Sequence, residues 1–469
     1  MIKTFEFFEG NFNNKQFYQK MLGLALPVMI QNFIASFLNL IDTVMVGRLG
    51  EAEIAAVGVA NQYFFFFIMF LIGLCAGCSV FISQYWGKND LANIKRILGI
   101  GLISVFIISL VFIIVGFLNP MKVMSLFNKD EIVIRLGADY LKIVLFSYLF
   151  TGITLVYSFS LRSIGNAVLP MLISFVALLC NAILNYTFIF GHFGAPALGI
   201  EGAALATLIA RALEAIILVA IIYFRKNELA ASVKELLDFT FGFVKNAYRT
   251  ILPVILNDIC FGLASLVYVA VYGRMGTQEI ATIQICNTVN NLFIVVIFGL
   301  SNAAAVMIGN SIGADKELLA KEYARKFSSL SVKVGIVLGL LIALTSPLML
   351  NFFNVSDVVR NSSQIILYII SAIFFVRISG IMLIVGILRG GGDATYAFMI
   401  EAFTMWFIGV PLTILGAFLF RFPVYLVYGL AIAEEIAKCI LGFLRLRSGR
   451  WIRNVTVSKC GDGSFSCPP

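Results

Sequence analysis

The sequence predicts an all-α polytopic membrane protein, with twelve transmembrane helices in two six-helix bundles related by a pseudo-twofold axis along the membrane normal. Two observations support this fold class. Of the 469 residues, 60% are hydrophobic and 13% are charged, a charged share about half that of soluble domains. The two halves of the chain also repeat one pattern of residues. A soluble bundle does not need so much apolar surface, so we expect the apolar segments to face lipid.

Twelve segments have the length and composition of membrane spans. A bilayer core takes about 20 apolar residues of helix, and each segment meets this requirement with few charges. In chain order the segments are 21–46, 55–84, 97–118, 138–160, 168–190, 200–224, 250–272, 281–311, 328–352, 364–388, 394–420 and 424–444.

Lys and Arg gather in alternate loops and at both ends of the chain, which by the positive-inside rule predicts cytoplasmic termini. The net charge of +9 therefore reflects membrane orientation, and we expect no nucleic-acid partner. The polar N-terminus lacks the features of a cleaved signal peptide. The predicted parts are an N-terminal cytoplasmic segment, an N-lobe, a cytoplasmic linker with an amphipathic helix, a C-lobe and a cytoplasmic tail: 1–20, 21–224, 225–249, 250–447 and 448–469.

An internal repeat relates the two lobes. A shift of 226 positions brings Pro27 onto Pro253 and the pair Gly47-Arg48 onto Gly273-Arg274. Each half holds an even number of spans, so both copies enter the membrane from the same side. Parallel repeats of this kind place a cavity between them, which is a transporter architecture.

Asp42 is the first candidate functional residue. It lies late in the first span, and its repeat counterpart is Tyr268, so the acid belongs to one lobe only. An ionisable side chain within a span is costly and is a functional-site hypothesis by default. A carboxylate there binds a cation or a proton. The alternative is an acid that reaches back to the membrane interface.

Further oxygen-bearing residues occur in the same half. Asn181 and Asn185 are four residues apart, so their amides share a helix face, either as interhelical contacts or as ligands. Thr207 and the Ala203 carbonyl, also four apart, offer the hard oxygen ligands that small cations take. Tyr140 is a candidate hydrogen-bond partner for an acid.

The second half carries its own charges within the spans. Asp258, Arg377 and Glu401 form a candidate C-lobe polar cluster, in which we expect Arg377 to pair with Glu401 or Asp258. Glu434 and Lys438, near the cytoplasmic end of the last span, are spaced i,i+4 and are expected to form a local pair.

No motif predicts an enzyme or a bound cofactor. The chain has a single histidine, His192, and no Walker-type glycine loop. Cys75 and Cys78 have redox-motif spacing but lie in mid-helix, where small buried thiols are the simpler interpretation.

Several motifs together resemble the multidrug and toxic compound extrusion (MATE) family, part of the larger multidrug, oligosaccharidyl-lipid and polysaccharide exporter group. The match spans roughly 15–454. The motifs are LPVMIQNFIASFLNLIDTVMVGRLG with its echo LPVILNDICFGLASLVYVAVYGRMG, and also ADYLKI, LRSIGNAVLP, CNAILNYTFIFG, GIEGAALAT, LRGGGDAT and RSGRWIRN.

This resemblance implies twelve helices in two lobes and an exporter of cationic or amphipathic organic compounds, driven by sodium or proton entry. The family's N-lobe cation or proton site maps onto Asp42, Asn181, Asn185, Thr207 and Tyr140 of this chain, and Pro27 matches the proline at which the first helix of some members bends. Position 185 is Asn where some relatives have Asp, which leaves Asp42 as the one N-lobe carboxylate. The C-lobe acids of the NorM-like branch are absent from the matching places, so the resemblance favours the N-lobe branch.

The leading hypothesis is therefore a secondary multidrug antiporter, monomeric and multi-pass in the plasma membrane, that exports small organic cations or drugs in exchange for Na+ or H+ at Asp42. The aromatic run from Tyr63 to Phe67, with Tyr157, is a candidate lining for an apolar cavity, or else faces lipid. The alternative is a flippase for lipid-linked saccharides, which would need several cationic side chains around its cavity. Only Arg211 and Arg377 are candidates for that role.

Overall fold

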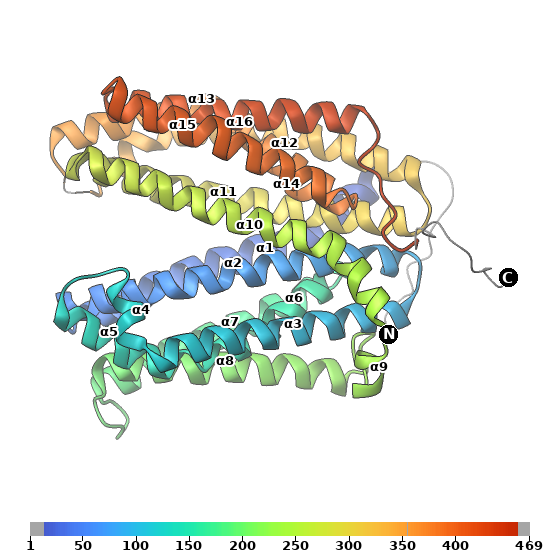
Figure 1. Cartoon of the computed structure of the whole chain (residues 1–469), viewed down its shortest axis with the longest axis horizontal. Coiled ribbons are helices and arrows are strands. Elements are labelled where there is room, and N and C mark those ends of the chain that lie inside the picture. Colours follow the sequence, from blue (N-terminus) through green and yellow to red (C-terminus); the bar gives the residue numbers. More distant parts are fainter. Residues whose placement is uncertain (1–13, 354, 458–469) are drawn as a thin grey trace.

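The computed structural model describes residues 14–353 and 355–457, with the side chains of residues 38–40 left aside. All regular structure within these ranges is helical. The helices form two bundles side by side, α1–α8 from the first half of the chain and α10–α16 from the second half (Figure 1). The predicted fold class is confirmed. Residues 1–13 and the end of the tail from residue 458 lie outside the described residues.

The N-terminal bundle contains six spans, of which one is broken. The predicted span 138–160 is two helices, α5 and α6, bent by 53° where Leu145 and Phe146 interrupt the helix. A short helix, α4, precedes them. The helices are α1 (Asn14–Gly47), α2 (Glu51–Gly87), α3 (Leu91–Leu118), α4 (Pro120–Ser125), α5 (Glu131–Val144), α6 (Ser147–Ser163), α7 (Val168–Phe190) and α8 (Gly199–Phe224).

The C-terminal bundle repeats this plan, with wider π-helical turns in two of its spans. These turns are Met382–Leu388, Thr404–Gly409 and Leu415–Leu419. The helices are α10 (Phe241–Met275), α11 (Thr277–Gly313), α12 (Glu317–Leu350), α13 (Asp357–Ile381), α14 (Ala394–Phe403), α15 (Val410–Ile414) and α16 (Val424–Arg447).

Length and apolarity identify most of the spans directly. In the described ranges, ten helices are each long and apolar enough to cross a membrane, and the bent pair α5–α6 makes an eleventh span. The remaining one is α16, which has 24 residues and is therefore about 36 Å long, sufficient for a bilayer core. Its apolarity is lowered by Glu434, Glu435 and Lys438, which point into the protein and not toward lipid.

The two bundles meet along α1 and α2 on one side and α10 and α11 on the other. Glycines allow the closest approach. A Cβ atom at Gly73 of α2 would lie 2.6 Å from the Ile255 Cα atom, and one at Gly77 would lie 2.9 Å from the Ile251 Cα atom. The backbones of α2 and α10 are therefore in direct contact, which only glycine permits at these positions.

The segment after α16 folds back and joins both bundles. The Val455 amide donates to Gln84 Oε1 in α2 at 2.8 Å, and Gln84 Nε2 donates to the Arg453 carbonyl at 3.1 Å. Trp451 is 1% exposed, and the Arg453 amide donates to the Gly391 carbonyl at 2.8 Å. The first part of the predicted tail is thus a packed, bundle-bridging segment.

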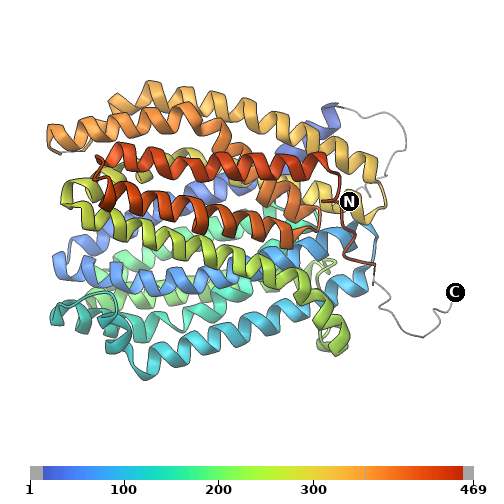
Figure 2. The same ribbon diagram turned by 45° about the horizontal axis from the view of Figure 1, so that its top comes forward.

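The predicted amphipathic helix over 225–249 differs from the structure. The connection contains only the short helix α9 (Val233–Leu237), and residues from Phe241 onward already belong to α10. Two ion pairs hold this connection against α3, Lys95 with Glu235 at 2.7 Å and Arg96 with Asp238 at 2.6 Å. The Lys95 ammonium lowers the pKa of Glu235 to about 2. Figure 2 shows α9 and the segment after α16 at the same end of the molecule.

Candidate functional site

A cavity of about 360 Å³ with both polar and apolar walls lies inside the N-terminal bundle, between α1, α2, α5, α6, α7 and α8. Its size falls at the lower end of the range of small-ligand pockets, about 300–1,000 Å³. All six predicted N-lobe site residues line it: Asp42, Tyr140, Asn181, Asn185, Ala203 and Thr207. The structure therefore brings together side chains from four helices that are far apart in the sequence.

Two amides hold the Asp42 carboxylate. Asn185 Nδ2 donates to Asp42 Oδ1 at 2.7 Å. Asn181, with its amide oriented so that both of its polar atoms are satisfied, donates to Asp42 Oδ2 at 3.0 Å. Both donors are neutral, so they orient the carboxylate without compensating its charge. In the part of the chain that the structure describes, no ion pair to Asp42 is present.

Oxygen atoms surround this carboxylate. Asn185 is only 2% exposed, yet its Oδ1 atom has no hydrogen-bond partner within the described residues. The Thr207 hydroxyl donates to the Ala203 carbonyl at 3.0 Å. Tyr140 lies beside Thr207. A buried amide oxygen without a donor is costly, and a cation or a protonated group beside Asp42 would satisfy it.

A second carboxylate lines the same cavity and is missing from the sequence prediction. Glu214 of α8 is 2% exposed, and its Oε2 atom accepts from Arg211 Nη1 at 2.8 Å. The expectation that Asp42 is the one N-lobe carboxylate is therefore wrong. The sequence does contain a sign of this pair, because Arg211 and Glu214 are spaced i,i+3 within an apolar span. Charged residues inside membrane spans usually pair with one another.

A hydrogen-bonded chain continues from Glu214 across the bundle. The Ser174 hydroxyl of α7 donates to Glu214 Oε1 at 2.7 Å, and Gln31 Nε2 of α1 donates to Ser174 at 2.7 Å. Arg162 of α6 then donates to Gln31 Oε1 at 2.6 Å. Four helices of the N-terminal bundle are connected through this chain.

Of the candidate aromatic lining residues, only some reach this cavity. Phe64 lines the cavity, but Tyr63, Phe67 and Tyr157 do not. Tyr63 donates to the Phe112 carbonyl at 2.8 Å, and Phe67 stacks on Tyr148 with ring centroids 4.4 Å apart. These rings are packed between helices because helical periodicity turns only one side chain in three or four toward the cavity.

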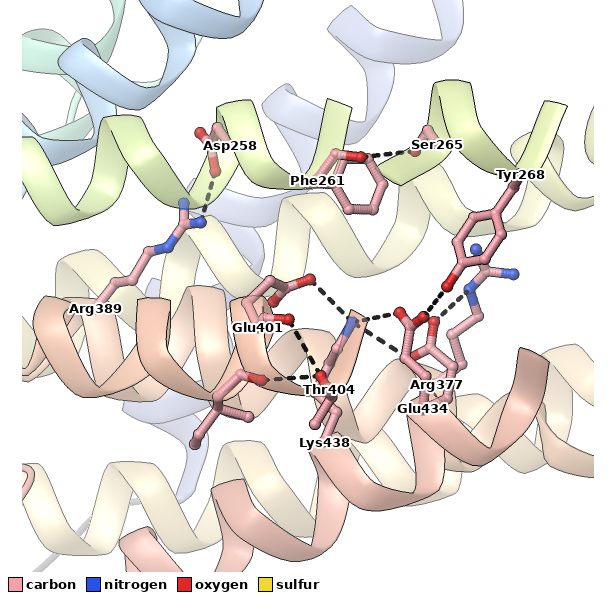
Figure 3. Close-up of polar contacts among 12 residues, drawn as sticks. Asp258, Phe261, Ser265, Tyr268, Arg377, Arg389, Glu401, Thr404, Glu434 and Lys438 are labelled. Atoms are coloured by element: carbon pink, nitrogen blue, oxygen red, sulfur yellow. Dashed lines mark hydrogen bonds and ion pairs between the residues drawn. The ribbon is translucent and has the colours of Figure 1, made fainter. Parts of the chain in front are cut away.

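The C-terminal bundle contains a separate charged cluster, and its pairing differs from the prediction (Figure 3). Asp258 pairs with Arg389 at 2.6 Å, and Glu401 pairs with Lys438 at 2.9 Å. Arg377 lies 3.7 Å from Glu435. The predicted pairing of Arg377 with Asp258 or Glu401 is therefore wrong.

Lys438 is the centre of this cluster. Its ammonium contacts Glu401 on α14 and, at 3.2 Å, Glu434 on its own helix, which confirms the predicted local pair. The Tyr268 hydroxyl donates to the other oxygen of Glu434 (Figure 3). Glu434 and Lys438 lie in the middle of α16 and not near its end, where the sequence places them. Lys438 and Glu434 are 4% and 5% exposed, so each charge depends on its partners.

The cysteine pair carries no sign of a site. Cys75 and Cys78 are buried in α2, at 1% and 3% exposure. Among the described residues, no group of three or more His, Cys, Asp or Glu side chains is placed to hold a metal ion.

Fold and cavity together define a multi-pass membrane transporter built from two repeated helical lobes. The chain belongs to the MATE family: the family model described as MatE matches residues 27–187 and again 253–415. The two matches start at Pro27 and Pro253, the same pair that aligns the internal repeat.

The chain is similar to proteins of this family over nearly its whole length. It is 26% identical over 447 residues to the "Probable multidrug resistance protein NorM" of Thermotoga maritima, covering 94% of each chain. It is 25% identical over 442 residues to the "Uncharacterized transporter YisQ" of Bacillus subtilis, covering 92% of this chain and 95% of that protein. Among solved structures, a mutant of the Vibrio cholerae MATE transporter VcmN superposes with a TM-score of 0.84 at 20% identity, covering 94% of this chain and 98% of that one.

Proposed function

We propose that the protein is a secondary multidrug antiporter that exports cationic or amphipathic organic compounds from the cell in exchange for Na+ or H+. The coupling ion binds at Asp42. The protein acts as a monomer in the plasma membrane, with its termini in the cytoplasm. Family membership and the similarity to the multidrug resistance protein NorM of Thermotoga maritima support the transport class. The observation that carries the ion assignment is the environment of Asp42.

Asp42 is a carboxylate inside a membrane bundle whose hydrogen-bond partners are neutral amides, beside an amide oxygen that lacks a donor. An uncompensated negative charge in this setting favours any monovalent cation or proton that can reach it. Asp42 lines the cavity inside the N-terminal bundle, so an ion in the cavity can reach its carboxylate. Occupancy of Asp42 then stabilises one conformation of the transporter, and the exported compound favours the other.

The composition of the cavity supports cations over anionic substrates. Its described lining includes two carboxylates, Asp42 and Glu214, and one guanidinium, Arg211, which is already paired. Arg377 contacts Glu435 in the other lobe. The cluster of cationic side chains that a lipid-pyrophosphate flippase would need is not found in the cavity lining.

The test is ethidium efflux from cells or vesicles with imposed Na+ or H+ gradients. Replacement of Asp42 by Asn removes the charge and keeps the shape, so efflux should lose its response to the gradient. Glu131→Gln, an exposed acid at the start of α5, is the control and should behave as wild type. Undiminished gradient-driven efflux by Asp42→Asn would refute the assignment. Stimulation by Na+ at fixed pH separates the two ions.

A further inference from the structure

Arg211 and Asp42 line the same cavity, yet they do not form an ion pair. Arg211 lies one turn beyond Thr207 on α8, and one helical turn is about 5.4 Å. Its guanidinium is close enough to act electrostatically on Asp42. Its side chain is 32% exposed, whereas that of Glu214 is 3% exposed. A long, partly exposed cation of this kind would be the natural competitor for any ion at Asp42.

The structure indicates why Arg211 stays away. Both Glu214 oxygens accept hydrogen bonds, Oε2 from Arg211 and Oε1 from Ser174. Every donor in the chain Arg162, Gln31, Ser174 points toward Glu214, which is its final acceptor. Glu214 is therefore held in place on both oxygens, by Arg211 of its own helix and by Ser174 of the neighbouring helix α7.

We infer that Glu214 is a positioning residue that holds Arg211 out of the Asp42 site and thereby reserves Asp42 for an exchangeable cation. The inference rests on the proposed function of Asp42. Two carboxylates thus have different roles in one cavity. Glu214 compensates the built-in guanidinium permanently, while Asp42, held only by amides, keeps the charge that an external ion neutralises.

The test uses charge rescue in the full-length protein, reconstituted in vesicles, with ethidium as the transported probe and an imposed Na+ or H+ gradient. In Glu214→Gln the freed guanidinium moves to Asp42, and gradient-driven transport should fall about tenfold, within the usual range of coupling energies. In the double variant Glu214→Gln/Arg211→Gln the competitor is absent, and transport should return to near the wild-type rate.

A purely structural role for Glu214 predicts no rescue, since the double variant breaks the same contacts. A double variant that transports no better than Glu214→Gln would overturn the inference. Should Glu214→Gln fail to fold, the comparison of the double variant with Arg211→Gln decides. The two variants should transport ethidium at equal rates, because Glu214 has no positioning role once Arg211 is removed. A double variant that transports much more slowly than Arg211→Gln would contradict the inference.

The outcomes also separate this inference from the proposed function. Loss of coupling in Asp42→Asn together with absence of rescue contradicts only the role of Glu214. Normal coupling in Asp42→Asn contradicts the proposed function itself, whatever the double variant does. The pH profile of transport gives an independent readout, because a guanidinium paired with Asp42 in Glu214→Gln should displace the profile, and its removal in Glu214→Gln/Arg211→Gln should restore the profile.

Discussion

Individual acids in this protein are distinguished by their partners. Asp42 is held by amides, Glu214 by a guanidinium and a hydroxyl, and Glu434 by an ammonium and a phenol. Removing a charge therefore has a different consequence at each site. Under the proposed function, loss of the charge at Asp42 is expected to affect ion binding, whereas loss of a charge inside a saturated cluster is expected to affect stability.

The Lys438 cluster provides a direct test of this distinction. Lys438→Met leaves Glu401 and Glu434 buried without their cation, and breaking a buried ion pair in this way costs about 3–5 kcal/mol. We expect a clear loss of stability in thermal unfolding of the purified protein. Lys142→Met is the matched control, because Lys142 pairs with Asp139 on the surface, with both side chains more than a third exposed. Similar small losses in both variants would contradict a stabilising role for the buried cluster.

Sequence spacing predicted some of these contacts and missed others for a physical reason. The pair Glu434–Lys438 follows from its i,i+4 spacing, and the same reasoning applied at i,i+3 would have found Arg211–Glu214. Asp258 and Arg389, which form an ion pair, are 131 residues apart in the sequence and lie on different helices. Local periodicity contains no information about which distant charges a fold brings together. The predicted pairing of Arg377 with Glu401 or Asp258 is wrong for this reason.

At the scale of elements, hydropathy predicted where helices occur but not how they are built. The bend between α5 and α6 lies within one continuous apolar run. The span predicted at 424–444 is the complete helix α16, and its charges are buried inside the protein. The extent of the bundle-bridging segment after α16 depends on contacts with Gln84 and Gly391, which have no local signature in the tail.

Gly391 tests how tightly this segment is docked. A Cβ atom at position 391 would lie 2.8 Å from the Trp451 carbonyl oxygen, so Gly391→Ala should cost about 1–3 kcal/mol through overpacking. The measurement is the midpoint of thermal unfolding. Gly429→Ala in α16 is the control, because nothing lies within 4 Å of its added methyl group. Equal behaviour of the two variants would show that the segment is not held at Trp451.

At the scale of the whole molecule, the two lobes are in contact at the end that carries α9. A Cβ atom at Gly87 of α2 would lie 3.0 Å from the Ala314 amide, just after α11. The repeat explains this contact, because Gly87 and Gly313 occupy corresponding places in the two lobes. The proposed antiport by alternating access predicts that the lobes separate here, because the space between the two repeats has to open toward each side in turn.

Cross-linking tests that requirement. Cysteines introduced at Lys88 and Asp315, next to the contacting residues, should react with a short bifunctional maleimide in a background in which the 8 native cysteines are replaced by Ser. Ethidium transport should stop on cross-linking. A cross-link between Lys95→Cys and Glu235→Cys, within one lobe at the same end, should leave transport intact. Full transport by the interlobe cross-linked protein would contradict lobe separation at this end.

The central claim is that one ion and the exported compound are linked through Asp42, and equilibrium binding tests it most directly. The affinity of purified protein for ethidium is measured by fluorescence across Na+ concentration and pH. Because linkage is reciprocal, the coupling ion should weaken ethidium binding in the wild type, and Asp42→Asn should bind ethidium with no such dependence. The same ion dependence in Asp42→Asn as in the wild type would contradict the account.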